Sequence, residues 1–238
     1  MRYELYYWSS IQGRGEFVRL ALEEAGATYV DVARTEGGDE RMQALLDNDG
    51  LACPPFAPPF LKAGNRLIAQ TANILLFLGE RHGLAPKTDA GTLWTHQLQL
   101  TLADFVGEVH DVHHPIAASL YYEDQRREAK RRAEDFVANR LPKYLGYFER
   151  VLASNPRGPA HLVGARLTYA DLSLFQVVAG MRYAFPNAMA RITRQLPRVS
   201  ALHAQVAARP RIAAYLASAR RLPFNQQDLF RHYAELDR

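Results

Sequence analysis

The first third of the chain alternates between short apolar runs and one amphipathic segment. Residues 3–8 are mostly aromatic or apolar, which is typical of a buried strand. After a short glycine-containing loop, residues 16–24 place their apolar side chains on one helix face. Gly26 is expected to end that helix, and residues 28–33 to form a second strand. The pattern therefore predicts a βαβ unit with parallel strands.

A proline-rich stretch separates this unit from a second group of elements. The prolines within residues 54–59 exclude a helix there. Residues 60–62 are expected to form a short strand, residues 63–66 a hairpin turn and residues 67–69 the returning antiparallel strand. Thr71 then begins a predicted helix. The order βαβ followed by ββα predicts a thioredoxin-like α/β domain.

The remainder of the chain shows only helical periodicity. Residues 83–90 have the composition of a linker, and beyond them long helical patterns are interrupted by prolines. We therefore expect a thioredoxin-like N-terminal domain at residues 1–82, a linker at residues 83–90, and an all-α C-terminal domain at residues 91–238.

Composition narrows the class of protein. A chain of 238 residues with 48% hydrophobic content can form one large or two small domains. The single cysteine, Cys53, cannot form an internal disulfide and is expected to be a small buried residue, which fits a reducing cytoplasm. There is no zinc-finger spacing, no signal-peptide pattern and no apolar run near the roughly 20 residues of a membrane span. We expect a cytoplasmic protein with no membrane partner.

A basic run and a histidine cluster could indicate binding of nucleic acid and of a metal ion, but neither interpretation is favoured. The net charge of +4 could indicate nucleic acid, but the basic run at residues 126–132 lies in a helical pattern and is interpreted as a solvated helix face. His110, His113 and His114 could suggest a metal site, but no acidic third ligand stands at a matching offset. No nucleic acid and no metal is expected.

Three local motifs resemble the cytosolic glutathione transferases, and together they cover nearly the whole chain. Leu-Tyr-Tyr-Trp at residues 5–8 with Gly-Arg-Gly-Glu at residues 13–16 resembles the opening of the tyrosine-type classes, mu and sigma especially. Residues 59–61 with the Gln-Thr pair at residues 70–71 resemble the cis-proline strand and glutamine-serine pair of that family. Residues 164–171 resemble the capping box of its helical domain.

This resemblance implies a glutathione transferase whose co-substrate is glutathione. Tyr7 falls on the catalytic position, where the phenol stabilises the thiolate of glutathione. Gln70 and Thr71 fall on the pair that grips the γ-glutamyl end, with Thr71 at a helix N-terminus that favours a carboxylate. Trp8 and Arg14 fall beside the catalytic position and are expected to contact glutathione.

Further substrate contacts follow from the same resemblance. Pro59 matches the cis-proline, and the residue before it, Pro58, has no N–H but keeps a carbonyl that can accept from the cysteinyl part of glutathione. Arg41 is the substitute for the pair that holds the glycyl carboxylate. Asp104 matches the segment that reaches the γ-glutamyl amine bound to the neighbouring subunit. A homodimer is therefore expected.

A second pocket is expected for the electrophile. In the family it is lined by the helix that contains Asp104 and by the helix after it, so His114 and Tyr121 are expected to border a pocket for a small hydrophobic electrophile. The aromatic C-terminal run at residues 222–233 is expected to pack back on the body and could cover this pocket.

Tyr7 is favoured as the thiolate donor, but alternatives remain open. A peptide thiol has a pKa of about 8.5, so a donor must favour the thiolate at neutral pH, and a tyrosine hydroxyl with a pKa of about 10 stays protonated to do so. Tyr6 should face the opposite side of the sheet. Ser9 or Ser10 could supply the hydroxyl instead, and Tyr7 could be an ordinary core aromatic.

Three functions remain open at this stage. The first is conjugation of glutathione to small hydrophobic electrophiles, a detoxification reaction. The second is non-catalytic binding of glutathione or hydrophobic ligands by the same fold. The third is a glutathione-dependent isomerase or peroxidase, since the same thiolate can attack other electrophiles.

Overall fold

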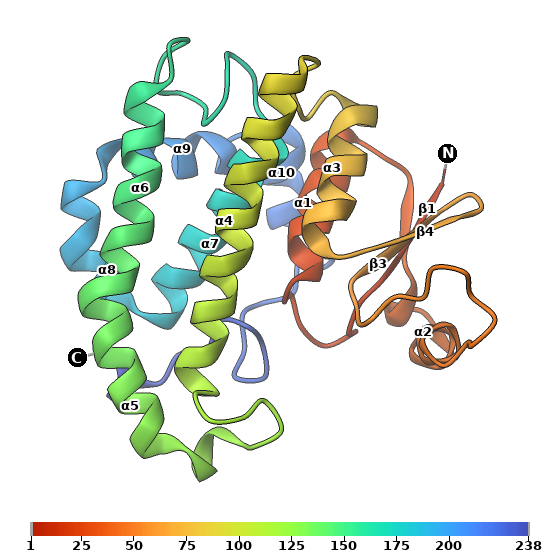
Figure 1. The fold of residues 1–238 in the computed structure, drawn as a ribbon, viewed down its shortest axis with the longest axis horizontal. Helices are drawn as coiled ribbons and strands as arrows, with labels where there is room; N and C mark the ends of the chain where they lie inside the picture. Colours follow the sequence, from red (N-terminus) through yellow and green to blue (C-terminus); the bar gives the residue numbers. More distant parts are fainter. Residues whose placement is uncertain (1, 238) are drawn as a thin grey trace.

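The computed structural model describes residues 2–237, and its N-terminal part is built on a small mixed sheet (Figure 1). The strand order is β2-β1-β3-β4. β1 (Tyr3–Tyr6) runs parallel to β2 (Tyr29–Asp31), whereas β3 (Phe60–Ala63) is antiparallel to β1 and to β4 (Arg66–Ala69). This is the predicted βαβ and ββα arrangement, with each strand within about two residues of its expected bounds.

Three helices accompany the sheet. α1 (Gly15–Ala25) and α3 (Thr71–His82) lie between the sheet and the helical body, and α2 (Gly38–Leu46) lies on the other side (Figure 1). Gly26 ends α1 in a left-handed conformation with φ of 63°. The sequence did not predict α2, because only Gly38 and Met42 of this helix are buried and it has no apolar stripe.

The rest of the described chain is helical. Four of its helices, α6, α8, α9 and α10, have a proline in the first turn, where the missing N–H costs nothing, so the prolines that interrupt the periodic pattern mark helix starts. Thr168 and Asp171 form the expected capping box at the start of α7. The helices are α4 (Asp89–His113), α5 (Arg126–Asp135), a π-helical turn (Phe136–Arg140), α6 (Leu141–Ser154), α7 (Tyr169–Ala184), α8 (Pro186–Ile192), α9 (Pro197–Ala207) and α10 (Pro210–Leu216).

The main apolar core runs through both halves of the molecule. Leu20 of α1 and Ile74 of α3 belong to the same buried cluster as Leu102 of α4 and Leu174 of α7. A smaller cluster around Tyr6 and neighbouring side chains fills the opposite face of the sheet. The predicted fold class, a thioredoxin-like domain followed by an all-helical domain, is confirmed, while the division at residues 82 and 91 stays a prediction.

Two further observations bear on the sequence-based expectations. Across residues 2–237, no helix combines the length and apolar character needed to cross a membrane. Cys53 is exposed, so its expected burial was wrong. It stands in an irregular segment between α2 and β3 that contributes few side chains to either core.

Candidate functional site

Tyr7 directly follows β1 and packs against the loop that begins α1. Its side chain is only 5% exposed. A Cβ atom on Gly13 would lie 2.0 Å from the Tyr7 hydroxyl, and one on Gly15 would lie 2.6 Å from the ring Cγ. The Gly-Arg-Gly motif therefore leaves the space that the tyrosine ring occupies.

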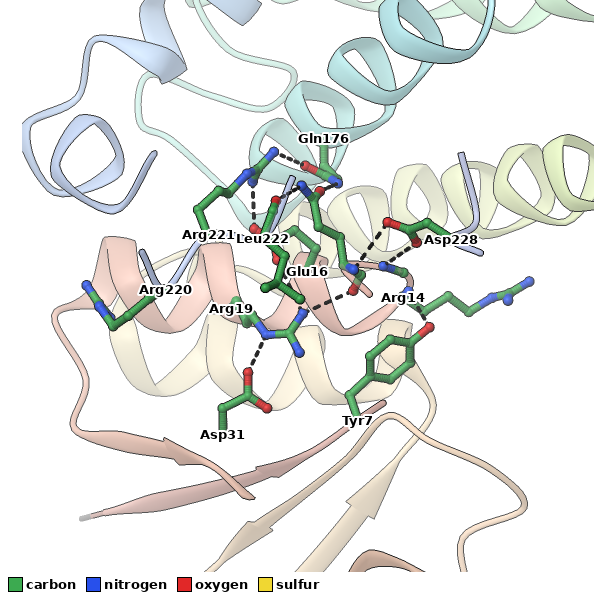
Figure 2. A network of polar contacts seen from close by, with 12 residues as sticks. Tyr7, Arg14, Glu16, Arg19, Asp31, Gln176, Arg220, Arg221, Leu222 and Asp228 are labelled. Atoms are coloured by element: carbon green, nitrogen blue, oxygen red, sulfur yellow. Dashed lines mark hydrogen bonds and ion pairs between the residues drawn. The ribbon is translucent and has the colours of Figure 1, made fainter. Parts of the chain in front are cut away.

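The hydrogen bond to the Tyr7 hydroxyl determines what that group can do. The backbone N–H of Arg14 donates to Tyr7 Oη at 2.9 Å (Figure 2). Because Tyr7 Oη accepts this bond, its own proton remains available to another acceptor. Burial raises the pKa of Tyr7, and the Arg14 N–H opposes this shift. The hydroxyl is therefore protonated at neutral pH and can act as a donor.

A carboxylate from the C-terminal tail holds the same loop. Asp228 is 1% exposed and accepts hydrogen bonds from the backbone N–H groups of Gln12 at 3.2 Å and Gly13 at 2.7 Å (Figure 2). It also accepts from the N–H of Leu229 at 2.6 Å. Burial raises the pKa of Asp228, with these three N–H groups opposing. The tail thus fixes the loop whose next amide, that of Arg14, binds Tyr7.

An ion-pair network behind the loop ties α1 to the C-terminal segment. Arg19 is fully buried and pairs with Glu16 at 3.2 Å and with Asp31 at 2.6 Å. Arg221 binds the other oxygen of Glu16 at 2.6 Å (Figure 2). The hydroxyl of Tyr215 donates to this same oxygen at 2.8 Å. These charges are compensated within the network, so we assign it a structural role.

A first cavity of about 290 Å³ lies between the N-terminal ends of α1 and α3 and the side of α4. Three of the predicted site residues line it: Arg14, Gln70 and Thr71. Gln70 has a φ of 69° and stands at the N-cap of α3, where no side chain caps the helix. The free N–H groups and dipole of this helix end favour an anion in the cavity.

Two polar residues of α4 also line this cavity, and the sequence did not single them out. Within the described residues, Gln99 Oε1, His96 Nδ1 and Thr71 Oγ1 are buried atoms without a hydrogen-bond partner. Buried polar groups are normally paired, so three unpaired ones around one cavity indicate a polar ligand. The sequence could have indicated these two residues, because a histidine and a glutamine three residues apart stand on the apolar side of a predicted helix.

A second cavity of about 660 Å³ contains the predicted electrophile-binding residues. His114 and Tyr121 both line it, together with Tyr122. Part of its wall comes from the C-terminal tail, through Arg231, Tyr233 and their neighbours. The tail does pack on the body, as expected, and Phe230 is fully buried. It forms one side of this cavity.

The histidines beside the second cavity are neutral. His113 Nε2 lies 2.9 Å from the carbonyl oxygen of Leu229, which can only accept, so this nitrogen carries the proton. His113 Nδ1 must then accept from His114 Nδ1–H, 2.6 Å away. Burial is the main cause that lowers the pKa of His113 to about 3 and that of His114 to about 4. Within residues 2–237 no group of side chains is arranged to hold a metal ion.

The other predicted contacts lie outside both cavities, and their roles stay predictions. Trp8 is 44% exposed, and Asp104 is exposed on α4. Arg41 donates to the carbonyl of Glu36 at 2.9 Å and to the hydroxyl of Thr35 at 2.6 Å. The peptide bond between Pro58 and Pro59 is cis, as the resemblance implied.

The alternative hydroxyl groups are placed differently from Tyr7. Tyr6 donates to Glu4 at 2.7 Å and belongs to the core on the opposite sheet face, as expected. Ser9 donates to Asp39 at 3.2 Å on the surface, and Ser10 is exposed. Tyr7 does not itself line the first cavity, but among these four it alone binds, through its hydroxyl, the backbone of Arg14, which does line it.

Comparisons with known proteins find similarity to glutathione S-transferases. The family described as "Glutathione S-transferase, C-terminal domain" matches residues 110–219. A glutathione S-transferase of Plasmodium falciparum (isolate 3D7) is 23% identical, with 90% of this chain and 94% of the relative covered. Glutathione S-transferase P of Bos taurus is 28% identical, with 91% and 92% covered.

Solved structures share the fold over nearly the full chain. The Pi-class glutathione S-transferase of Onchocerca volvulus aligns with a TM-score of 0.72 at 21% identity, covering 94% of this chain and 98% of that one. Prostaglandin synthase D of Nilaparvata lugens aligns with a TM-score of 0.71 at 19% identity, covering 94% and 100%. At these identities the structural likeness is one of fold.

Proposed function

We propose that the chain is a member of the glutathione S-transferase superfamily and an enzyme that conjugates the thiolate of glutathione to small hydrophobic electrophiles; its similarity to proteins of that name supports this. One observation carries the assignment of Tyr7 as the catalytic donor. Its hydroxyl accepts a hydrogen bond from the Arg14 N–H at 2.9 Å and so keeps its own proton for the sulfur. A neutral phenol that donates to a thiolate favours the charged form of the thiol.

The first cavity supplies the groups that an acidic peptide needs. The γ-glutamyl carboxylate binds at the N-terminus of α3, where Thr71 offers a backbone N–H and a hydroxyl and Gln70 adds an amide. Gln99 Oε1 can accept from the γ-glutamyl amine, because it has no partner within the described residues. Glutathione held in this way brings its cysteinyl sulfur toward Arg14 and Tyr7.

The reaction needs no covalent intermediate with the enzyme. The glutathione thiol loses its proton to water, and Tyr7 holds the resulting thiolate by a hydrogen bond. The sulfur then forms a bond to the electrophilic carbon, and the leaving group departs with the electron pair of the broken bond. Positioning of the two reactants and stabilisation of the thiolate provide the catalysis. His114 and Tyr121 border the cavity for the electrophile.

The finer assignments are part of the proposal. We infer a tyrosine-type enzyme that works as a cytoplasmic homodimer in detoxification, with Asp104 reaching the glutathione of the neighbouring subunit. Trp8, Arg41 and the carbonyl of Pro58 are further proposed contacts to glutathione. The class within the superfamily is left at tyrosine-type, since matched relatives include proteins named P and a Pi-class structure.

The decisive experiment combines binding and turnover. Glutathione binding is measured by calorimetry, and conjugation is followed with 1-chloro-2,4-dinitrobenzene, for the wild type and for Tyr7→Phe. We expect Tyr7→Phe to bind glutathione but to lose about tenfold to a hundredfold in kcat, because the thiolate loses one donor. Binding without turnover in the wild type supports a carrier instead. Turnover that survives in Tyr7→Phe rejects this donor and directs attention to Ser9 or Ser10.

A further inference from the structure

The wall of the second cavity contains a guanidinium without a carboxylate partner. Arg231 lines the cavity, and its Nε donates to the carbonyl of Asp228 at 2.7 Å, with Nη2 3.4 Å from the carbonyl of Gln227. No ion pair within residues 2–237 involves this side chain. Main-chain carbonyls orient the group but leave its positive charge uncompensated, and Nη1 remains free to donate.

The groups around Arg231 do not neutralise this charge. The neighbouring histidines are neutral, and the charge of Arg231 contributes to the lowered pKa values of His110, His113 and His114. The acidic side chain in the cavity wall is Glu123, which is 63% exposed and stands 3.8 Å from Arg126 on the outer side. The cavity therefore places the positive charge of Arg231 beside aromatic side chains, with an exposed glutamate as the acidic group of its wall.

Hydrogen bonds of Asp228 connect Arg231 with the loop that binds Tyr7. Asp228 binds the Gly13 N–H through its carboxylate and holds Arg231 through its carbonyl, so one residue fixes both the α1 loop and the cation. The charge of Arg14 also contributes to the lowered pKa of His110, whose ring stacks on that of His114 with centroids 4.8 Å apart. Asp228 thus links the wall of the cavity to the loop whose amide binds Tyr7.

We propose that this cavity selects aromatic electrophiles that carry a carboxylate or a similar anionic group, and that Arg231 binds this group. The inference rests on the proposed transferase function and specifies its second substrate. The stacked rings of Tyr122 and Tyr233, with centroids 3.8 Å apart, give the pocket an aromatic wall. Nη1 can donate to a carboxylate on the ring, so Arg231 fixes the far end of the ring while the reacting carbon faces the sulfur.

The test compares two aryl chlorides that differ in charge. 4-Chloro-3,5-dinitrobenzoate carries a carboxylate, and 1-chloro-2,4-dinitrobenzene is neutral; both lose chloride when a thiolate attacks the ring. The measured quantity is the ratio of kcat/KM for the benzoate to kcat/KM for the neutral compound. We expect Arg231→Gln to lower this ratio about tenfold, mainly through the KM of the benzoate, as for loss of one charged hydrogen-bonding pair.

Two further variants separate charge recognition from structural damage. Arg231→Lys keeps the charge and should retain the ratio within about threefold. Arg131→Gln removes an exposed arginine of α5 and should leave the ratio unchanged. A ratio that is unchanged in Arg231→Gln overturns the proposal. General distortion of the site would lower kcat/KM for both substrates alike, so only a change in the ratio reports recognition of the charge.

A binding measurement keeps the proposal separate from the proposed function. If the wild type turns over neither chloride, the transferase assignment fails, and equilibrium binding of 3,5-dinitrobenzoate and 1,3-dinitrobenzene is measured instead. A preference for the benzoate that disappears in Arg231→Gln supports the anion site. Equal binding of the two compounds by the wild type contradicts it.

Discussion

At the scale of single residues, the site depends on a glycine that leaves room for a hydroxyl. Gly13 has a φ of 45°, and a Cβ there would lie 2.0 Å from the hydroxyl of Tyr7. We expect Gly13→Ala to lower the free energy of unfolding by about 2 kcal/mol and to displace Tyr7, with loss of most activity. Denaturant unfolding and the conjugation assay measure the two effects.

The matched control for this change is a glycine with open space around it. Gly107 lies within α4, and no atom would lie within 4 Å of a Cβ placed there. Gly107→Ala should raise the free energy of unfolding by about 0.5–1 kcal/mol, because alanine favours the helix, and should leave turnover unchanged. Equal losses in both variants would contradict the role assigned to Gly13.

Thr71 allows a prediction in which stability and binding change in opposite directions. Its hydroxyl is buried without a partner in the described structure, so the folded protein bears a desolvation cost that a bound carboxylate would relieve. Thr71→Val should raise the free energy of unfolding by about 1 kcal/mol and weaken glutathione binding about fivefold to tenfold. Denaturation and calorimetry test this, and unchanged affinity would reject the γ-glutamyl site.

The sequence predicted some of the residues around the first cavity and missed others. Tyr7, Gln70 and Thr71 were predicted because each stands in a short local motif at a strand end or helix start. Gln99 and His96 were missed, since nothing in a single helical pattern distinguishes a polar side chain facing a cavity from one facing solvent. Their significance depends on α3, which lies across the cavity.

At the scale of elements, the C-terminal tail holds the loop before α1 that binds Tyr7. Asp228 binds the N–H groups of Gln12 and Gly13 across 215 residues or more of sequence. Asp228→Asn replaces one acceptor oxygen with a donor that would face an N–H. We expect the loop to loosen, kcat to fall about fivefold to tenfold, and the pKa of bound glutathione to rise, as read from the pH profile of kcat/KM.

The other end of the tail offers a control of the same chemistry. Asp237 accepts from the N–H groups of Asn187 at 2.6 Å and Ala188 at 2.9 Å, at the start of α8 rather than at the loop that binds Tyr7. Asp237→Asn should lower the free energy of unfolding without moving the pH profile. If both variants shift the profile equally, Asp228 has no specific role in positioning the loop.

At this scale the sequence predicted most helices and strands, but it did not predict contacts between segments far apart in the chain. The strands and α1 follow from hydrophobic periods of two and 3.6 residues, and helix starts from proline positions. The surface helix α2 has too few buried residues to show such a period. The tail has no period at all, so its path past α1 to the second cavity required the structure.

At the scale of the whole molecule, buried neutral histidines couple stability to acid pH. His113 has its pKa lowered to about 3, chiefly by burial, with Arg231 adding to the shift, and burial also lowers that of His203 to about 4. The unfolded chain binds protons at these groups near pH 6.5 and the folded chain does not. Stability must therefore rise with pH, and it is lost as the pH falls from about 6.5 toward 4.

Other groups act in the opposite sense over part of this range. The raised pKa values of Asp171 and Asp228 mean that the folded state takes up protons there before the unfolded state does. The pH dependence of the free energy of unfolding of the wild type therefore combines both effects. A substitution that removes one histidine measures the contribution of that histidine alone.

The contribution of His113 to the pH dependence of stability can be measured with His113→Gln. The glutamine amide can still donate to the carbonyl of Leu229, which His113 Nε2 binds in the wild type. Urea unfolding at pH 7 and pH 4.5 gives the loss of stability on acidification for each protein. We expect the variant to lose about 2.5 kcal/mol less than the wild type, since two pH units of differential binding of one proton correspond to about 2.7 kcal/mol. An equal loss in both would show that His113 is charged in the folded protein, and the neutral histidine pair beside the second cavity would then be wrong.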